Sequence, residues 1–297
     1  MIDPRTLRTF HAICRAGSIS GAARELNISQ PSVSTAIAQL EARLNTRLFE
    51  RTRSGIVLTP SGKALKARAE MLDHLLRDAE AEIAAADEGI AGPLRVGGTP
   101  GALVSLLPRA LGLLEQQQPR LALNVLERSD RELLAMLRAG DIELAFVTTE
   151  IEEPPGDIAE HTFTRDPFAL IVGRANDSLP AEISLKDTIG MRWVMPEAQG
   201  AFRRQVDALF VDAGVPAPRD VVRCDSLLTT KAIVRGGTRV TILPMQVAAA
   251  ELSIGVLRAV TLTEARFSRS VGVRHVRGHP LSPLALQLLE RLGQSIA

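Results

Sequence analysis

Residues 18–44 most constrain what this chain can fold into, because they contain two short helical patterns separated by a tight turn. Ser20 is in position to cap the first helix, whose narrow apolar side consists of Ala22, Ala23 and Leu26. In the second helix Ser29 takes the N-cap position, and Pro31 falls in the first turn, where its missing N–H costs no hydrogen bond. Helix, turn and helix in this order form a motif that binds duplex DNA.

The second of these helices has an apolar face and a polar face. The apolar residues recur at helical spacing and are expected in a small core; they are Val33, Ile37, Leu40 and Leu44. The polar face, at its N-terminal end, presents short side chains and one apolar wedge, which suit base edges and phosphates in a major groove. The residues expected to contact DNA here are Ser29, Gln30, Pro31, Ser32, Ser34, Thr35 and Gln39.

Residues 49–58 predict a β-hairpin with its turn at Ser54-Gly55 and with Arg51 and Arg53 at the tip. A wing of this kind reaches phosphates or the minor groove, although an ordinary solvated hairpin is the alternative. The charge distribution also favours DNA binding, because residues 1–66 hold ten basic and four acidic side chains, a net charge of +6. The remaining residues carry a net −5, so a basic head precedes a mildly acidic body.

A long helix is expected after the hairpin, starting at Thr59-Pro60, since no Gly or Pro interrupts residues 63–88. Its small and apolar residues repeat every 3.5 positions, as in a coiled-coil seam: Leu65, Ala69, Leu72, Leu76, Ala79, Ile83 and Ala86. We therefore expect two chains to pair along this helix; the alternative is a helix packed on its own domain. Gly89 and Gly92-Pro93 are expected to end the helix and to form a hinge.

Beyond the hinge the pattern alternates strand and helix, which predicts an α/β body with a parallel sheet. Its first unit has expected strands at 94–98, 121–127 and 143–148 and helices at 99–118 and 130–139. The second has expected strands at 168–173, 192–195, 221–224 and 239–243 and helices at 201–213 and 226–235. A return strand at 271–275 and a helix at 281–292 complete the body.

Ligands of such sheets bind beyond the carboxyl ends of the strands, where free N–H groups at helix starts attract anions. The strand ends expected to share one crevice are 99–102, 127–129, 148–149, 199–200 and 225–226, with Phe202 as an apolar wall. Plain helix capping is the alternative for each hydroxyl. Arg165, Arg203 and Arg223 near these loops favour an anionic ligand. The candidate ligand residues are Thr99, Pro100, Gly101, Ser129, Thr148, Gln199, Phe202 and Ser226.

The segments 17–26, 29–34, 39–41, 47–51 and 58–62 together resemble the LysR-type transcriptional regulators, and looser motifs at 105–108, 137–145 and 233–244 extend the resemblance over the body. The resemblance implies an N-terminal winged helix-turn-helix, a linker helix and a two-part effector domain similar to periplasmic binding proteins. It implies promoter DNA and RNA polymerase as partners, and a dimer that pairs into a tetramer. Thr99, Ser129, Thr148 and Gln199 match positions that contact the effector in this family.

The expected domains are 1–59 for DNA binding, 60–88 for the linker helix and 89–297 for effector binding. Within the last, one subdomain covers about 93–162 and 268–297 and the other about 163–267. A small, anionic metabolite is expected to control DNA bending and transcription. The alternative is an α/β solute-binding or enzymatic body with a fused DNA-binding head.

Several other functions are not expected from the residue pattern. The chain has no nucleotide-binding loop, nucleophile elbow or zinc-protease motif, and His275 and His279 lie on either side of a Gly-Pro break, so neither an enzyme nor a metal site is expected. Cys14 is interpreted as packing and Cys224 as a buried small residue, with redox sensing as its alternative. No run approaches a membrane span and no signal peptide is recognised, so a cytoplasmic protein is expected.

Overall fold

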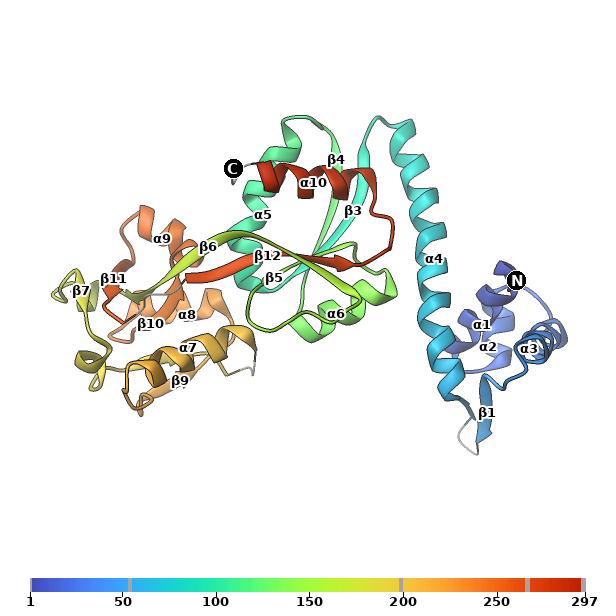
Figure 1. Ribbon diagram of the computed structural model, residues 1–297, viewed down its shortest axis with the longest axis horizontal. Helices are drawn as coiled ribbons and strands as arrows, with labels where there is room; N and C mark the ends of the chain where they lie inside the picture. The colour runs from blue at the N-terminus through green and yellow to red at the C-terminus, as the bar shows by residue number, and fades with distance from the viewer. Residues whose placement is uncertain (1, 53–54, 198–199, 265–267, 295–297) are drawn as a thin grey trace. The chain divides into compact units, whose positions relative to one another are not determined.

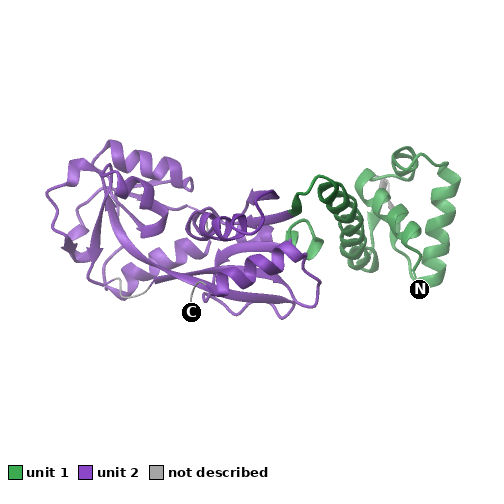
Figure 2. Ribbon diagram, turned by 90° about the horizontal axis from the view of Figure 1, so that it is seen from above, with its two compact units in different colours: residues 1–93, 135–142 green, residues 94–134, 143–297 purple. Residues whose placement is uncertain are grey.

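The computed structural model describes residues 2–52, 55–197, 200–264 and 268–294. The chain divides into two compact units, one of residues 1–93 and 135–142 and the other of residues 94–134 and 143–297 (Figure 2). The first unit contains the helix-turn-helix and the long helix. The second contains most of the α/β body.

The head is built from three helices, α1 (Pro4–Ala16), α2 (Ile19–Glu25) and α3 (Gln30–Leu44). Ser29 caps α3 as expected, accepting a hydrogen bond from the Ser32 N–H. The prediction for α2 was wrong by two residues, because Ser18 accepts the capping bond from Gly21 N–H, while the Ser20 hydroxyl donates to Gln30 Oε1 at 3.2 Å. The helices share an apolar core that includes Phe10, Ala22, Val33, Ile37 and Leu40.

The wing is a hairpin of β1 (Phe49–Thr52) and β2 (Gly55–Leu58), which pair antiparallel from Phe49↔Leu58 to Thr52↔Gly55. Gly55, which was expected in the turn, therefore belongs to the second strand. Arg51 is paired with Ile56 in the ladder, and Arg53 lies outside the described residues.

The long helix α4 (Pro60–Asp87) is capped by Thr59, which accepts from the Gly62 N–H. Two residues of the expected seam pack within the head instead: Ala69 is buried in its core, and Leu65 packs against that core. The later seam residues are open in this single chain, with Leu76 39% and Ile83 66% exposed. A dimer seam is thus available in the second half of α4 only.

The first half of the body contains β3 (Ala91–Gly98), α5 (Pro100–Glu115), β4 (Leu121–Glu127), α6 (Asp130–Ala139) and β5 (Leu144–Thr148). Strand β3 lies between β4 and β5 and is parallel to β5, as the alternating pattern predicts. Gly92-Pro93, the expected hinge, lies inside β3, and the boundary between the two compact units falls directly after Pro93. Helix α5 ends three residues earlier than expected and packs against α10 (Pro283–Gln294).

The second half contains β8 (Trp193–Met195), α7 (Ala201–Asp212), β9 (Val221–Arg223), α8 (Leu227–Gly236) and β10 (Thr241–Pro244). Strands β8 and β9 are parallel, and Trp193 is fully buried in the core of this half. Five smaller elements complete it: β7 (Glu182–Ile183), α9 (Ala249–Ser253) and the 3₁₀ turns η1 (Arg174–Asn176), η2 (Leu185–Thr188) and η3 (Met245–Ala248). Strand β11 (Arg258–Leu262) was not expected from the sequence.

Two long antiparallel strands, β6 (Ile158–Val172) and β12 (Ser268–Val276), run side by side from one half of the body to the other (Figure 1). Strand β12 pairs with β5 of the first half, whereas the far end of β6 pairs with β10 and β11 of the second. The sequence predicted β6 only from Phe168, because its polar first half, residues 158–167, lacks an apolar run. This strand pair is the structural link between the two halves.

Candidate functional site

The N-terminal part of α3 presents a polar surface opposite its buried face. Val33, Ile37 and Leu40 are buried, whereas Ser34 is half-buried. Of the residues predicted to contact DNA, the exposed ones are Ser29, Gln30, Pro31, Ser32, Thr35 and Gln39. This geometry leaves polar side chains exposed on one side of a helix whose other side is fixed by packing. Such a face can enter a major groove.

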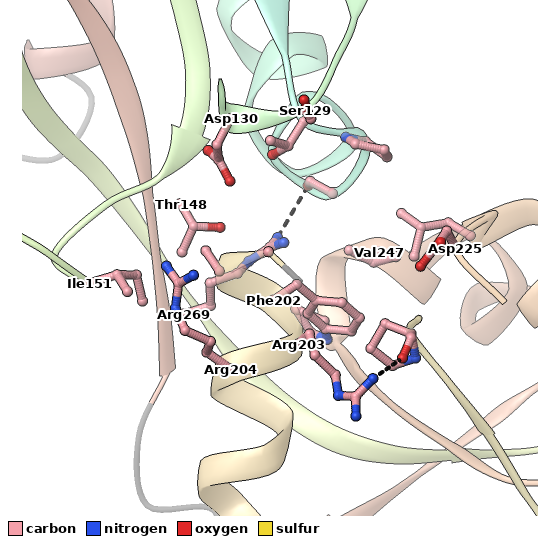
Figure 3. Close-up of a pocket in the computed structure, with 18 of the residues that line it drawn as sticks. Ser129, Asp130, Thr148, Ile151, Phe202, Arg203, Arg204, Asp225, Val247 and Arg269 are labelled. Carbon is pink, nitrogen blue, oxygen red and sulfur yellow. Dashed lines mark hydrogen bonds between the residues drawn. The ribbon is translucent and has the colours of Figure 1, made fainter. Parts of the chain in front are cut away.

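The second candidate site is a cavity of about 840 Å³ in the body. Its lining comes from both halves, from α5, α6 and β5 of the first and from α7 and the start of α8 of the second, together with β12; Figure 3 draws part of this lining. This volume lies in the range of sites for small organic ligands. Apolar side chains form much of the lining, among them Leu134, Ile151, Met195, Phe202, Leu243 and Val247.

Most of the predicted ligand residues line this cavity. Those that do are Thr99, Pro100, Gly101, Ser129, Thr148 and Phe202. Ser226 is not among the described residues of the lining; its hydroxyl caps α8 instead, accepting from the Thr229 N–H at 3.2 Å. Gln199 lies outside the described residues. Residues at the ends of three separate strands, β3, β4 and β5, thus share one cavity with Phe202 of α7.

The three hydroxyls that line the cavity from the first half differ in their burial and hydrogen bonding. Thr99 stands at the N-cap of α5 but makes no side-chain capping bond. Thr148 is buried at the end of β5. The Ser129 hydroxyl donates to Glu132 Oε2 at 2.6 Å, and this bond lowers the pKa of Glu132. Thr99 is therefore freer than Ser129 to bind a ligand.

The predicted arginines have carboxylate partners. Arg165 lies 3.3 Å from Glu150, Arg203 lies 2.7 Å from Asp207, and Arg223 lies 3.7 Å from Glu197. Of the three, Arg203 lines the cavity, and it also donates to the Pro196 carbonyl at 2.8 Å.

Several charged residues of the lining were missed in the sequence, among them Arg269 on β12 and Asp130 at the start of α6. Burial lowers the pKa of the Arg269 guanidinium, while Asp166 raises it. Burial raises the pKa of Asp130, against the attraction of Arg274 and Arg204. No local motif marks either residue. Their one sequence signal is a charged side chain inside, or directly beside, a predicted strand end.

Both cysteines are half-buried thiols. Burial raises the pKa of Cys14 to about 11, which makes its reactive thiolate rare. Cys224 lines the cavity and lies 3.6 Å from the Ser226 carbonyl oxygen. Among the described residues there is no cluster of three metal-binding side chains, and no helix is long and apolar enough to cross a membrane.

A winged helix-turn-helix followed by an α/β body with a ligand-sized cavity defines a DNA-binding regulator with an effector domain. Residues 4–63 match the bacterial regulatory helix-turn-helix protein family of the lysR type, and residues 87–297 match the LysR substrate binding domain. The chain therefore belongs to the LysR family of transcriptional regulators.

Similar proteins agree with this assignment. The chain is 25% identical over 297 residues to the HTH-type transcriptional regulator GalR of Pseudomonas putida, a match that covers all of this chain and 75% of that protein. A full-length variant of OxyR from Pseudomonas aeruginosa has the same fold, with a TM-score of 0.72 at 22% identity, over 98% of this chain and 95% of that one. The LysR-family regulator CbnR in complex with its target DNA gives a TM-score of 0.60 at 23% identity, over 99% of this chain and all of that one. These relatives are regulators rather than enzymes.

Proposed function

We propose that this regulator binds promoter DNA through α3 and the wing, and that a small organic anion in the cavity of the body changes the bend of that DNA. The observation that carries the proposal is the cavity itself, lined from both halves of the body by helix starts and by a buried arginine. A ligand held by both halves favours one angle between them. It shifts the population only by its difference in affinity for the two states.

The DNA contacts are proposed for the polar side of α3, from Ser29 to Gln39, and for Arg51 and Arg53 of the wing. The net charge of +6 in residues 1–66 supports contacts to phosphates. To test this, a DNA duplex is first selected from a random pool by its binding to the full-length protein. The affinity of the protein for that duplex is then measured by fluorescence anisotropy. We expect the logarithm of affinity to fall linearly with the logarithm of salt concentration. Binding that ignores salt, or that survives loss of residues 1–60, contradicts it.

The proposed dimer pairs the second halves of two α4 helices, where Leu75, Leu76 and Ile83 are exposed. Apolar side chains in a row on a helix are stabilised when a second helix covers them. Pairing of dimers into a tetramer, contact with RNA polymerase and a cytoplasmic location complete the proposal.

The effector is proposed to contact Thr99, Pro100, Gly101, Ser129, Thr148, Gln199 and Phe202. The chemical class of the effector is tested by measuring thermal unfolding of the full-length protein with a panel of carboxylates, amino acids and sugars. A ligand at 100 times its dissociation constant adds roughly 2.7 kcal/mol to stability. Stabilisation by carboxylates supports an anionic effector, whereas stabilisation by neutral sugars alone contradicts it.

A further inference from the structure

His161 on β6 and His275 on β12 face each other across the strand pair that links the two halves of the body. Their Nε2 atoms lie 3.2 Å apart, and their rings are almost parallel, with 7° between the planes and 5.4 Å between the centroids. His161 is opposite Val273 in the ladder, so the two histidines are diagonal neighbours on one face of the sheet. Neither histidine belongs to the described lining of the effector cavity.

The hydrogen bonds of His275 determine which of its ring nitrogens carries the proton. Its Nδ1 lies 3.2 Å from the Val276 carbonyl oxygen, which can only accept, so Nδ1 must donate. The neutral ring of His275 therefore has its lone pair on Nε2, the atom that faces His161. A histidine that binds a metal commonly has this arrangement, in which the other ring N–H donates to a carbonyl and fixes the ring.

The ring of His161 is supported on one side and accessible to solvent. It stacks with the buried Phe163, with 6.3 Å between the centroids and 23° between the planes. His161 itself is exposed and His275 is half-buried, so a hydrated ion can reach both Nε2 atoms. Partial burial, together with the charges of His275 and Arg277, lowers the pKa of His161 and so favours the neutral ring that can bind a metal.

The separation of the two Nε2 atoms matches the distance between two ligand atoms on one metal ion. Zinc binds histidine nitrogen at about 2.0–2.1 Å, so nitrogens 3.2 Å apart meet a shared ion at an angle of about 100–106°. Tetrahedral zinc has angles of roughly 109°. The ion replaces the proton between the rings: His161 releases a proton from Nε2 and takes one up at Nδ1, and both rings turn their lone pairs toward the ion.

Among the described residues no third histidine, cysteine or acidic side chain completes a cluster with this pair. Water therefore fills the remaining positions, and an ion with two protein ligands exchanges more readily than one in a structural zinc site. Imidazole nitrogen suits Zn²⁺, Ni²⁺ and Cu²⁺, whereas Mg²⁺ and Ca²⁺ prefer oxygen. The expectation of no metal site rested on His275 and His279, but the fold brings His275 to His161, 114 positions away.

We propose that His161 and His275 form a binding site for one divalent transition-metal ion of the zinc type, held by the two Nε2 atoms and by water. An ion bound to both residues bridges β6 and β12, and it therefore stabilises the strand pair that links the two halves. Neither the proposed DNA contacts nor the proposed effector contacts use these histidines, so the metal site goes beyond the proposed function.

The test uses the full-length protein without a histidine tag, freed of metal with EDTA and then dialysed. Isothermal titration calorimetry with Zn²⁺ gives the affinity and the number of ions bound, and thermal unfolding with Zn²⁺ gives the stabilisation. We expect one Zn²⁺ per chain and a raised unfolding temperature, and no such effect from Mg²⁺ at the same concentration. With Cu²⁺ as the probe, the electron paramagnetic resonance spectrum should show coupling to two imidazole nitrogens.

The variants His161→Ala and His275→Ala each remove one ligand. We expect each to weaken Zn²⁺ binding at least about tenfold, because the second ring binds an ion that the first already holds nearby. His161 is exposed, so its replacement removes the ligand without opening the core. His279→Ala is the matched control, since His279 follows the end of β12 and lies outside the pair, and we expect unchanged affinity.

Three results would overturn the metal site. Absence of heat and of stabilisation with millimolar Zn²⁺ means that the two rings share a hydrogen bond and nothing more. Unchanged Zn²⁺ affinity in either His161→Ala or His275→Ala places the ion elsewhere, as does an equal loss in His279→Ala. Coupling of Cu²⁺ to a single nitrogen excludes a shared ion. Loss of Zn²⁺ binding in both variants, with unchanged binding to the selected duplex, supports the site and leaves the proposed function intact.

Discussion

The carboxylate of Glu41, near the end of α3, accepts the backbone N–H of Leu48 at 2.8 Å and thereby joins the recognition helix to the start of the wing. The same oxygen accepts the Phe49 N–H at 3.3 Å, and the other pairs with Arg47 at 3.0 Å. Glu41 is a buried acidic residue in a basic head. Glu41 therefore joins the wing to α3 by hydrogen bonds, in addition to the packing of Phe49, Ile56 and Leu58 on the core of the head.

Replacing Glu41 with Ala is expected to destabilise the head by about 1–3 kcal/mol, because two backbone N–H groups lose their acceptor. Faster amide hydrogen exchange at Leu48 and Phe49 should accompany weaker DNA binding. Arg47→Ala is the control, since the Arg47 side chain is 82% exposed and such pairs contribute about 1 kcal/mol or less. Unchanged exchange in Glu41→Ala would show that the carboxylate does not hold the wing.

Ser34→Ala is expected to reduce discrimination between DNA sequences, because Ser34 lies on the polar side of α3. A lost base contact costs about 1–3 kcal/mol at that base pair. Arg53→Ala should instead weaken binding to all sequences and reduce the salt dependence, as loss of a phosphate contact does. Affinities for the selected duplex and for a scrambled one separate the two effects. Equal losses on both duplexes for both variants contradict this division.

Ile83→Glu is expected to weaken the dimer, because it places a charge on the exposed apolar stripe of α4. Burial of such a side chain contributes about 1.5–3 kcal/mol, so the dimer dissociation constant should rise at least about tenfold. Sedimentation equilibrium measures this. Ala84→Glu adds the same charge to the neighbouring face of the helix and should leave the dimer intact. An unchanged association state in Ile83→Glu excludes this stripe as the seam.

Asp130→Asn is expected to stabilise the body at about pH 7 by about 1 kcal/mol. Burial raises the pKa of Asp130 above its ordinary value of 3.8, so the unfolded chain releases this proton at a lower pH than the folded chain. Stability therefore falls as the pH rises through 3.8 to the folded pKa, and Asn avoids this loss. Thermal unfolding should show the gain at about pH 7 and none at about pH 3.

Asp220→Asn is the matched control with the opposite sign. Hydrogen bonds from Arg239 and Arg192 lower the pKa of Asp220, so its contribution is present above its ordinary pKa of 3.8 and is lost as the pH falls. This variant should lower the unfolding temperature at about pH 7. A gain in both variants would mean that removing any carboxylate stabilises the body, and that burial of Asp130 is not the cause.

The elements predicted well are those whose signals are local. Strand β4 and helix α6 have the predicted bounds, and Ser29 and Thr59 cap the predicted helices, because caps and apolar periods involve neighbours in sequence. The first half of β6 was missed because its stability comes from pairing with β12, about a hundred residues away. Leu65 and Ala69 fit a coiled-coil period equally well, yet they pack on the head. The spacing of apolar residues along a helix does not show which surface of the protein packs against them.

The sequence by itself determined the family, the DNA-binding head, the long helix and the α/β alternation of the body, because each follows from spacing over a few turns. Most of the ligand residues that it predicted also line the cavity, since strand ends in a parallel sheet meet at one edge. Only the tertiary structure brought Arg269 to Asp166, 103 positions apart, and set Arg269 beside Gly101. A buried charge is stable only where distant elements supply its partners, and no local pattern in a sequence records that meeting.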